Sequence, residues 1–248
     1  MTTALPPDPF TPALLLIDLQ VDFSPSHTNS PDPQGTLAVP SAPLTIPPIL
    51  QLLSLPFPHK IFTKDSHPPN HISFASNHPP PHNVPFASFT TITHPTDPTI
   101  TLSTRLWPVH CIQHSRGWEF ISEIRAWLDT HPREVTAVVE KGQHPNIETY
   151  SAFRDPFPPS PSRTPITADP PLEPLLRQHN VTDVYVVGLA GDYCVKETVL
   201  HCVELGFRTW VVREGVASVD EGQEGWGEAK RRMEEAGARV VGIEGEEV

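Results

Sequence analysis

The chain has few cysteines, no apolar run of membrane-spanning length and no basic, hydrophobic leader, and each shortage excludes a class of protein. Its 248 residues include only 3 cysteines, an odd number without the spacing of a zinc ribbon. Such usage is typical of a reducing compartment. We therefore expect an intracellular, cytoplasmic protein, with the nucleus as an alternative, and no membrane partner.

Basic residues are also scarce. Lysine and arginine total 17 against 29 acidic residues, which gives a formal net charge of -12. A chain that binds duplex nucleic acid needs a basic excess to neutralise phosphates, so no nucleic-acid partner is expected. Nothing in the composition fixes the number of subunits, and a homo-oligomer remains open.

Proline, by contrast, is abundant. The 32 prolines concentrate near residues 25–48, 79–98 and 156–174. Proline cannot donate a ladder hydrogen bond, so these stretches are interpreted as extended, solvent-exposed loop insertions without a role in the chemistry. They lengthen the connections of a single domain that covers residues 1–248.

Strand and helix patterns alternate along the rest of the chain. Short β-branched runs are typical of parallel strands buried on both faces, and we expect strands at 13–18, 60–64, 135–139, 184–188, 208–212 and 239–243. Helical spacing appears near 46–55, 119–128, 172–179, 194–205 and 226–236. The fold class is therefore α/β, a three-layer sandwich in which a mainly parallel six-stranded sheet is flanked by helices on both faces.

Three of the expected strands end next to a reactive side chain. Asp18 ends the first strand, Lys141 closes the third, and Cys194 follows the fourth after a short glycine-containing turn. The carboxyl ends of parallel strands share one edge of a sheet, where ligands bind. Cys194 is also expected in the first helical turn, where the helix dipole and a nearby lysine favour the thiolate. A carboxylate could carry the thiol proton to a leaving group.

A second group has the residue types of a metal site. Asp65 and His67 follow an apolar run, and strand alternation places them on the same side. His110 supplies another imidazole, and a carboxylate with two histidines suits zinc, iron or manganese with positions left open for water or substrate. His71 and His78 lie on the same loop and are alternative ligands.

Together these residues resemble the nicotinamidase (pyrazinamidase/nicotinamidase) family of the isochorismatase-like cysteine hydrolase superfamily. The resemblance covers nearly the whole chain. It is carried, in order, by the segments Leu16–Phe23, Lys64–Phe74, Leu106–Cys111, Lys141–Gly142 with Tyr150–Phe153, Val187–Val195 and Gly206–Thr209.

The resemblance implies specific roles. Asp18, Lys141 and Cys194 would be the catalytic triad, and the N–H groups of Ala190 and Cys194 would form an oxyanion hole after a cis peptide bond. Asp65, His67 and His110 would bind one divalent metal ion per chain, zinc first and iron or manganese as alternatives, with His71 behind them or in the pocket. Phe23, Trp107 and Tyr150 would surround the pyridine ring of the substrate.

The implied activity is metal-dependent hydrolysis of nicotinamide to nicotinic acid and ammonia, a step of NAD salvage. Two alternatives stand beside it. The first is a related hydrolase that acts on another small amide or on the vinyl ether of isochorismate. The second is a catalytically silent protein whose proline-rich loops bind partners as polyproline helices.

Overall fold

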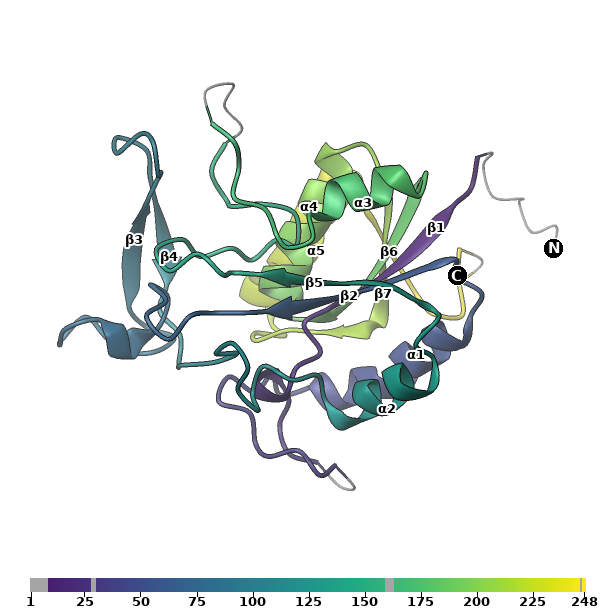
Figure 1. Cartoon of the computed structure of the whole chain (residues 1–248), viewed down its shortest axis with the longest axis horizontal. Helices are drawn as coiled ribbons and strands as arrows, with labels where there is room; N and C mark the ends of the chain where they lie inside the picture. Colours follow the sequence, from purple (N-terminus) through teal and green to yellow (C-terminus); the bar gives the residue numbers. More distant parts are fainter. Residues whose placement is uncertain (1–8, 28–29, 159–162, 246) are drawn as a thin grey trace.

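One sheet of six strands runs through the computed structural model, which describes residues 9–27, 30–158, 163–245 and 247–248 (Figure 1). The strand order is β5-β2-β1-β6-β7-β8, and every neighbouring pair is parallel. The predicted fold class is confirmed. The strands are β1 Pro12–Ile17, β2 His59–Asp65, β5 Val135–Lys141, β6 Asp183–Leu189, β7 Arg208–Ala217 and β8 Arg239–Val241.

Helices cover both faces of the sheet. In Figure 1, α1 and α2 lie on one side and α3, α4 and α5 on the other. No helix in the described part of the chain is long and apolar enough to cross a membrane. The helices are α1 Ala42–Ser54, α2 Ser122–Thr130, α3 Leu172–Gln178, α4 Lys196–Glu204 and α5 Glu228–Ala236. Gly237 caps α5 with a φ of 114°, a conformation that glycine adopts without strain.

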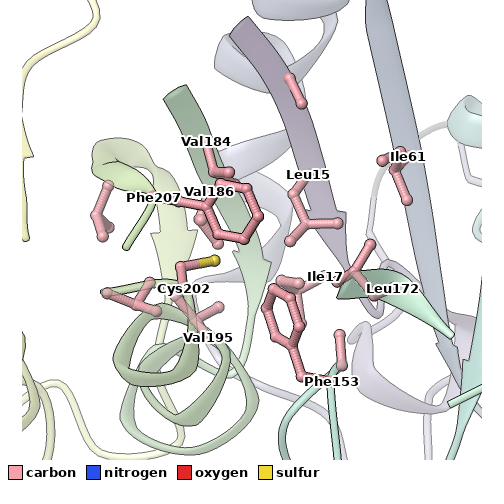
Figure 2. Close-up of a cluster of buried hydrophobic side chains, with 14 of the residues drawn as sticks. Leu15, Ile17, Ile61, Phe153, Leu172, Val184, Val186, Val195, Cys202 and Phe207 are labelled. Atoms are coloured by element: carbon pink, nitrogen blue, oxygen red, sulfur yellow. The ribbon is translucent and has the colours of Figure 1, made fainter. Parts of the chain in front are cut away.

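Strand β1 is apolar throughout because it is buried on both faces. Leu15 and Ile17 pack into the core under α3, α4 and α5, which Figure 2 shows with Val186 of β6. Leu14 and Leu16 point the other way, into the core under α1 and α2. Full burial of each such side chain stabilises the fold by roughly 1.5–3 kcal/mol. The central strand is therefore rigid, and so is the residue that follows it.

The proline-rich segments are not only loops. α1 begins at Ala42, inside the segment 25–48, because Pro43 fits the first helical turn and Ile46, Ile49, Leu52 and Leu53 are buried. Its two internal prolines each remove a helix hydrogen bond, and this burial outweighs the loss. α3 begins at Leu172, inside 156–174. Within these segments, residues 28–29 and 159–162 lie outside the described residues.

An antiparallel hairpin was not predicted. β3 Phe89–Thr93 pairs with β4 Thr101–Arg105 and extends away from the main sheet (Figure 1). β3 begins inside the segment 79–98, whose proline content led us to expect an irregular loop. The prolines fall outside the paired residues, which are rich in threonine and include phenylalanine and isoleucine, residue types that favour a strand.

A buried carboxylate attaches the first proline-rich segment to α2. Asp32 Oδ1 accepts hydrogen bonds from Arg116 at 2.6 Å and Arg125 at 2.8 Å, and Oδ2 accepts the Ser122 N–H at 2.6 Å. Burial alone would raise the pKa of Asp32, but the bonds from Arg125 and Ser122 hold it below its ordinary value of 3.8. The segment is thus held against the start of a helix.

We expect Asp32→Ala to lower the free energy of unfolding by about 1.5–3 kcal/mol at neutral pH, since it removes the charge-assisted hydrogen bonds of a buried carboxylate. Because the folded pKa is depressed, this contribution exists above the unfolded pKa and is lost as the pH falls through the folded pKa. Urea unfolding at several pH values measures it. Asp129→Ala, at an exposed position of the same helix, is the control, and equal losses in the two variants would contradict the assignment.

Candidate active site

The three predicted strand-end residues meet at one edge of the sheet. Lys141 Nζ lies 2.9 Å from Asp18 Oδ2 and donates a hydrogen bond to Cys194 Sγ at 3.3 Å. All three residues are buried. The parallel order of β5, β2, β1 and β6 places their carboxyl ends together, so the convergence predicted from the sequence is confirmed.

Local backbone geometry sets the positions of Asp18 and Cys194. Asp18 has a φ of 50°, and its carboxylate accepts a hydrogen bond from Thr63 Oγ1 at 2.6 Å. Cys194 lies in a wide π-type turn, Gly191–Val195, that precedes α4, and not in the first turn of a helix that begins at residue 194. The Leu189–Ala190 peptide is cis, as the family resemblance implied.

Burial favours the protonated form of the Cys194 thiol. Burial raises the pKa of Cys194 well above its ordinary value, and Asp18 and Asp65 add to this effect while Lys141 opposes it. Lys141 lowers the pKa of the thiol as expected, but the expectation left out desolvation and two neighbouring carboxylates, which raise it. A base must take the proton when the thiol reacts.

Asp18 is the candidate for this base. Burial raises the pKa of Asp18 to about 6, although Lys141 acts to lower it. Burial also acts against the charge of Lys141, but Asp18 and Asp65 outweigh it and raise the pKa of Lys141 well above its ordinary value. The ammonium therefore stays charged, and Asp18 is the group whose proton affinity suits exchange near neutral pH.

Next to the thiol, Asp65, His67 and His110 present ligand atoms that all lie within 4.8 Å of one another. Asp65 Oδ2 is 3.6 Å from His67 Nε2 and 3.9 Å from His110 Nε2. The two Nδ1 atoms face backbone carbonyls, those of Gly142 and Pro108, each at 2.8 Å. This arrangement leaves both Nε2 lone pairs directed at the same space.

These residues fit a divalent metal ion. His67 Nε2 is buried and has no hydrogen-bond partner among the described residues. Burial, followed by the nearby His67, lowers the pKa of His110 to about 3, so its imidazole is neutral, which is the metal-binding form. Gly142, with a φ of 71°, has no room for a Cβ, which would lie 2.5 Å from the His67 ring. The absence of a side chain at Gly142 therefore lets its backbone lie close to the His67 imidazole.

The alternative ligands are engaged elsewhere. His71 Nδ1 is 2.8 Å from Ser73 Oγ, and its Nε2 is 3.3 Å from the Ile147 carbonyl. His71 instead stacks on His67 with ring centroids 4.0 Å apart. His78 Nε2 lies 2.6 Å from the Ile72 carbonyl. His71 thus lies behind His67, in one of the two places that the sequence left open for it.

Glu148 was not among the site residues predicted from the sequence. This carboxylate is buried. One of its oxygens, a ring nitrogen of His67 and a ring nitrogen of His71 all lie within 4.8 Å of one another. Burial raises its pKa, and Asp65 adds to the effect. Glu148 stands two residues before Tyr150 in a loop, with no periodicity to indicate burial, and only the neighbouring family segment could have drawn attention to it.

An open pocket lined by Cys194, Asp65 and His110 joins the thiol to the proposed metal ligands. Phe23, Trp107 and Tyr150, the predicted aromatic walls, all line it, and Trp107 Nε1 donates to Tyr150 Oη at 3.1 Å. Leu37 and Val39, from the first proline-rich segment, are buried and line it as well, so the interpretation of that segment as solvent-exposed is wrong at these residues. The full lining is Phe23, Leu37, Val39, Asp65, Trp107, His110, Glu148, Tyr150, Ala190, Tyr193, Cys194 and Val219.

Comparisons with known proteins agree with this geometry. The isochorismatase domain matches residues 12–245. The chain is 33% identical to a nicotinamidase of Escherichia coli K12, covering 92% of this chain and 93% of that protein. The crystal structure of the yeast nicotinamidase bound to the inhibitor nicotinaldehyde superposes with a TM-score of 0.79 at 30% identity, covering 93% and 99% of the two chains. The pyrazinamidase of Pyrococcus horikoshii in complex with zinc gives 0.64 at 26% identity, covering 94% and 99%.

Replacement of either imidazole should weaken metal binding. Loss of a group that only supports a metal ligand typically weakens metal binding by roughly 10- to 100-fold. We expect His67→Ala and His110→Ala, which remove a proposed ligand itself, to raise the Kd for zinc by more than this. Elemental analysis after dialysis measures the bound metal. His78→Ala is the control and should retain wild-type metal content; the reverse pattern would make His78 the ligand.

Proposed function

Since the chain belongs to the isochorismatase family, we propose that it is a metal-dependent cysteine amidohydrolase that converts nicotinamide to nicotinic acid and ammonia. The observation that carries this function is the meeting of Cys194, Asp18 and Lys141 with a metal-type donor set at one aromatic-walled cavity. The similarity to nicotinamidases over almost the whole chain supports the substrate. The reaction fits NAD salvage, and a cytoplasmic location remains our expectation.

The chemistry follows from the contacts of the thiol. Asp18 takes the proton of Cys194 while Sγ attacks the carboxamide carbon, and Lys141 balances the developing negative charge. Asp18 then gives this proton to the departing ammonia as the C–N bond breaks. A water attacks the resulting thioester, Asp18 removes its proton, and the proton returns to sulfur as the C–S bond breaks.

The backbone beside the thiol is suited to the oxyanion. Ala190 and Cys194 both line the cavity, and we assign their N–H groups to the developing negative oxygen. Donors of this kind typically contribute roughly 3 kcal/mol each to transition-state stabilisation. Phe23, Trp107 and Tyr150 would hold the pyridine ring, because flat aromatic walls exclude water and stack on a planar heterocycle.

Asp65, His67 and His110 would hold the metal, which we propose to be zinc, with iron or manganese as alternatives, at one ion per chain. When bound, the metal would supply a Lewis-acid site for the ring nitrogen of nicotinamide. Asp65 also faces Lys141, with Oδ1 2.5 Å from Nζ. The donor set and the catalytic ammonium therefore share a carboxylate.

The two alternative functions are not favoured. A catalytically silent binding protein would not need three reactive side chains buried together, with Asp18 and Cys194 both next to Lys141. A hydrolase for isochorismate or another amide does not explain the similarity of nearly the whole chain to nicotinamidases. Nicotinamide itself is thus the substrate to test first.

Cys194→Ala should reduce ammonia release from nicotinamide by roughly 10⁴-fold or more, because the proposed mechanism has no other nucleophile. Metal content and the unfolding transition should stay unchanged, since the thiol is not among the proposed ligands. Cys202→Ala, which replaces a buried cysteine on α4, is the matched control and should keep its activity. Ammonia release by Cys194→Ala near the wild-type rate would rule out the covalent mechanism.

Removal of the metal should also stop turnover. We expect dialysis against a chelator to abolish ammonia release, and added zinc, iron or manganese to restore it, because the ring nitrogen would lose its anchor. Rates measured after each addition identify the metal that restores activity. Full activity of a protein shown by elemental analysis to be metal-free would contradict the metal dependence.

A further inference from the structure

The family segment around Asp18 contains two more polar side chains, Gln20 and Asp22, that the proposed mechanism does not use. Gln20 is fully buried. Positions 18, 20 and 22 follow the central strand directly, at the edge of the sheet where the site lies. A buried amide and a carboxylate at such a place need hydrogen-bond partners, and these partners reveal what the side chains do.

Gln20 holds the backbone of a metal ligand. Its Oε1 accepts the Asp65 N–H at 2.8 Å, and its Nε2 donates to the Asp65 carbonyl at 2.8 Å. The second Nε2 hydrogen is donated to the Trp118 carbonyl at 2.9 Å. Both donors and the acceptor of the amide are therefore used, two of the three on Asp65, so the side chain fixes the peptide units from which the Asp65 carboxylate projects.

Asp22 does the same for the segment that carries His110. Its Oδ2 accepts the N–H of Cys111, the next residue, at 2.7 Å. Thr36, whose N–H is 3.4 Å from Asp22 Oδ1, donates its hydroxyl to the Val109 carbonyl at 2.7 Å. The backbone is thus held on both sides of His110, and the same bonds attach this segment to the one that carries Leu37.

The segment that presents Gln20 and Asp22 is itself rigid. Val21 N–H donates to the Glu119 carbonyl at 2.9 Å, Asp22 N–H to the Gly117 carbonyl at 3.0 Å, and Ile121 N–H to the Leu19 carbonyl at 2.9 Å. Gly117 permits this approach, since a Cβ there would lie 1.9 Å from Asp22 Oδ2. Gln20 and Asp22 project from this hydrogen-bonded backbone, so they can set the positions of the backbone groups that they bind.

We propose that Gln20 and Asp22 are positioning residues for the metal site, Gln20 through Asp65 and Asp22 through the His110 segment. The inference rests on the proposed function, because Asp65 and His110 are metal ligands only there. Asp65 also contacts Lys141, so the position of the Asp65 carboxylate governs both the donor set and the charge beside the thiol. One five-residue segment, from Asp18 to Asp22, then supplies the base and holds two ligands of the metal.

The first test removes the amide of Gln20. Gln20→Met keeps the length of the side chain and loses all three hydrogen bonds, and Gln20→Glu keeps an acceptor for Asp65 N–H but cannot donate to the two carbonyls. We expect both variants to raise the Kd for zinc by roughly 10- to 100-fold, measured by competition with a chromophoric chelator. The absorption spectrum of the cobalt-substituted protein should also change, because the Asp65 oxygen shifts.

The second test compares two variants at Asp22. Asp22→Ala removes the acceptor for Cys111 N–H, whereas Asp22→Asn retains a carbonyl oxygen in the same place. Zinc affinity should fall in Asp22→Ala and return toward the wild-type value in Asp22→Asn. This pair keeps the proposal testable even if the Gln20 variants do not fold.

Tyr185→Phe is the control, because it removes one hydrogen bond of a buried tyrosine, to the Glu247 carbonyl, outside the cavity. It should lower the melting temperature of the metal-free protein without changing the Kd for zinc. If Gln20→Met and Asp22→Ala behave in the same way, both residues are merely structural and the proposal is overturned. A wild-type protein that binds no zinc, iron or manganese would overturn the proposed metal site and this inference together.

Discussion

The ammonium of Lys141 is the group on which the rest of the site depends. It contacts the carboxylates of Asp18 and Asp65 and the thiol of Cys194, and all four residues are buried. An unpaired charge in such a place costs several kcal/mol, so neither carboxylate can be removed without effect on the lysine. Asp65 faces Lys141 with Oδ1 and the two imidazoles with Oδ2, and through it the thiol and the metal ligands form one electrostatic unit.

The sheet order makes this unit possible. β2 lies between β5 and β1, and its last residue, Asp65, is in register with Lys141 at the end of β5. β1 separates β2 from β6, which places Asp18 between Asp65 and the turn that carries Cys194. An antiparallel neighbour would put one of these side chains at the opposite edge. The catalytic arrangement is therefore a property of strand order, and it needs no loop to fold over the site.

The ends of strands can be predicted from a sequence, and this explains why the convergence of Asp18, Lys141 and Cys194 and the pairing of Asp65 with His67 could be predicted. His110 follows no predicted strand and was proposed from its residue type and the family resemblance. The reactivity of the thiol could not, because it depends on burial and on two carboxylates whose distances appear only in three dimensions. The hairpin β3–β4 and the start of α1 were not predicted, because they lie in or next to proline-rich segments that were interpreted as loops, although Pro43 fits a first helical turn. Glu148 lies in a loop, where no periodic pattern marks a buried residue.

Reactivity and selectivity come from different parts of this chain. The ends of the sheet strands carry the proposed base, the ammonium and a proposed metal ligand, whereas loops supply most of the pocket walls, including Phe23, Trp107 and Tyr150. Leu37 and Val39 belong to the first proline-rich segment, which Asp32 holds against α2 and Asp22 holds through backbone bonds such as Leu37 N–H to the Asp22 carbonyl at 3.0 Å. A change in that segment can therefore reshape the cavity while the contacts of Lys141 stay in place. Proline suits such a wall, because a restricted backbone loses less entropy when it is held in one position.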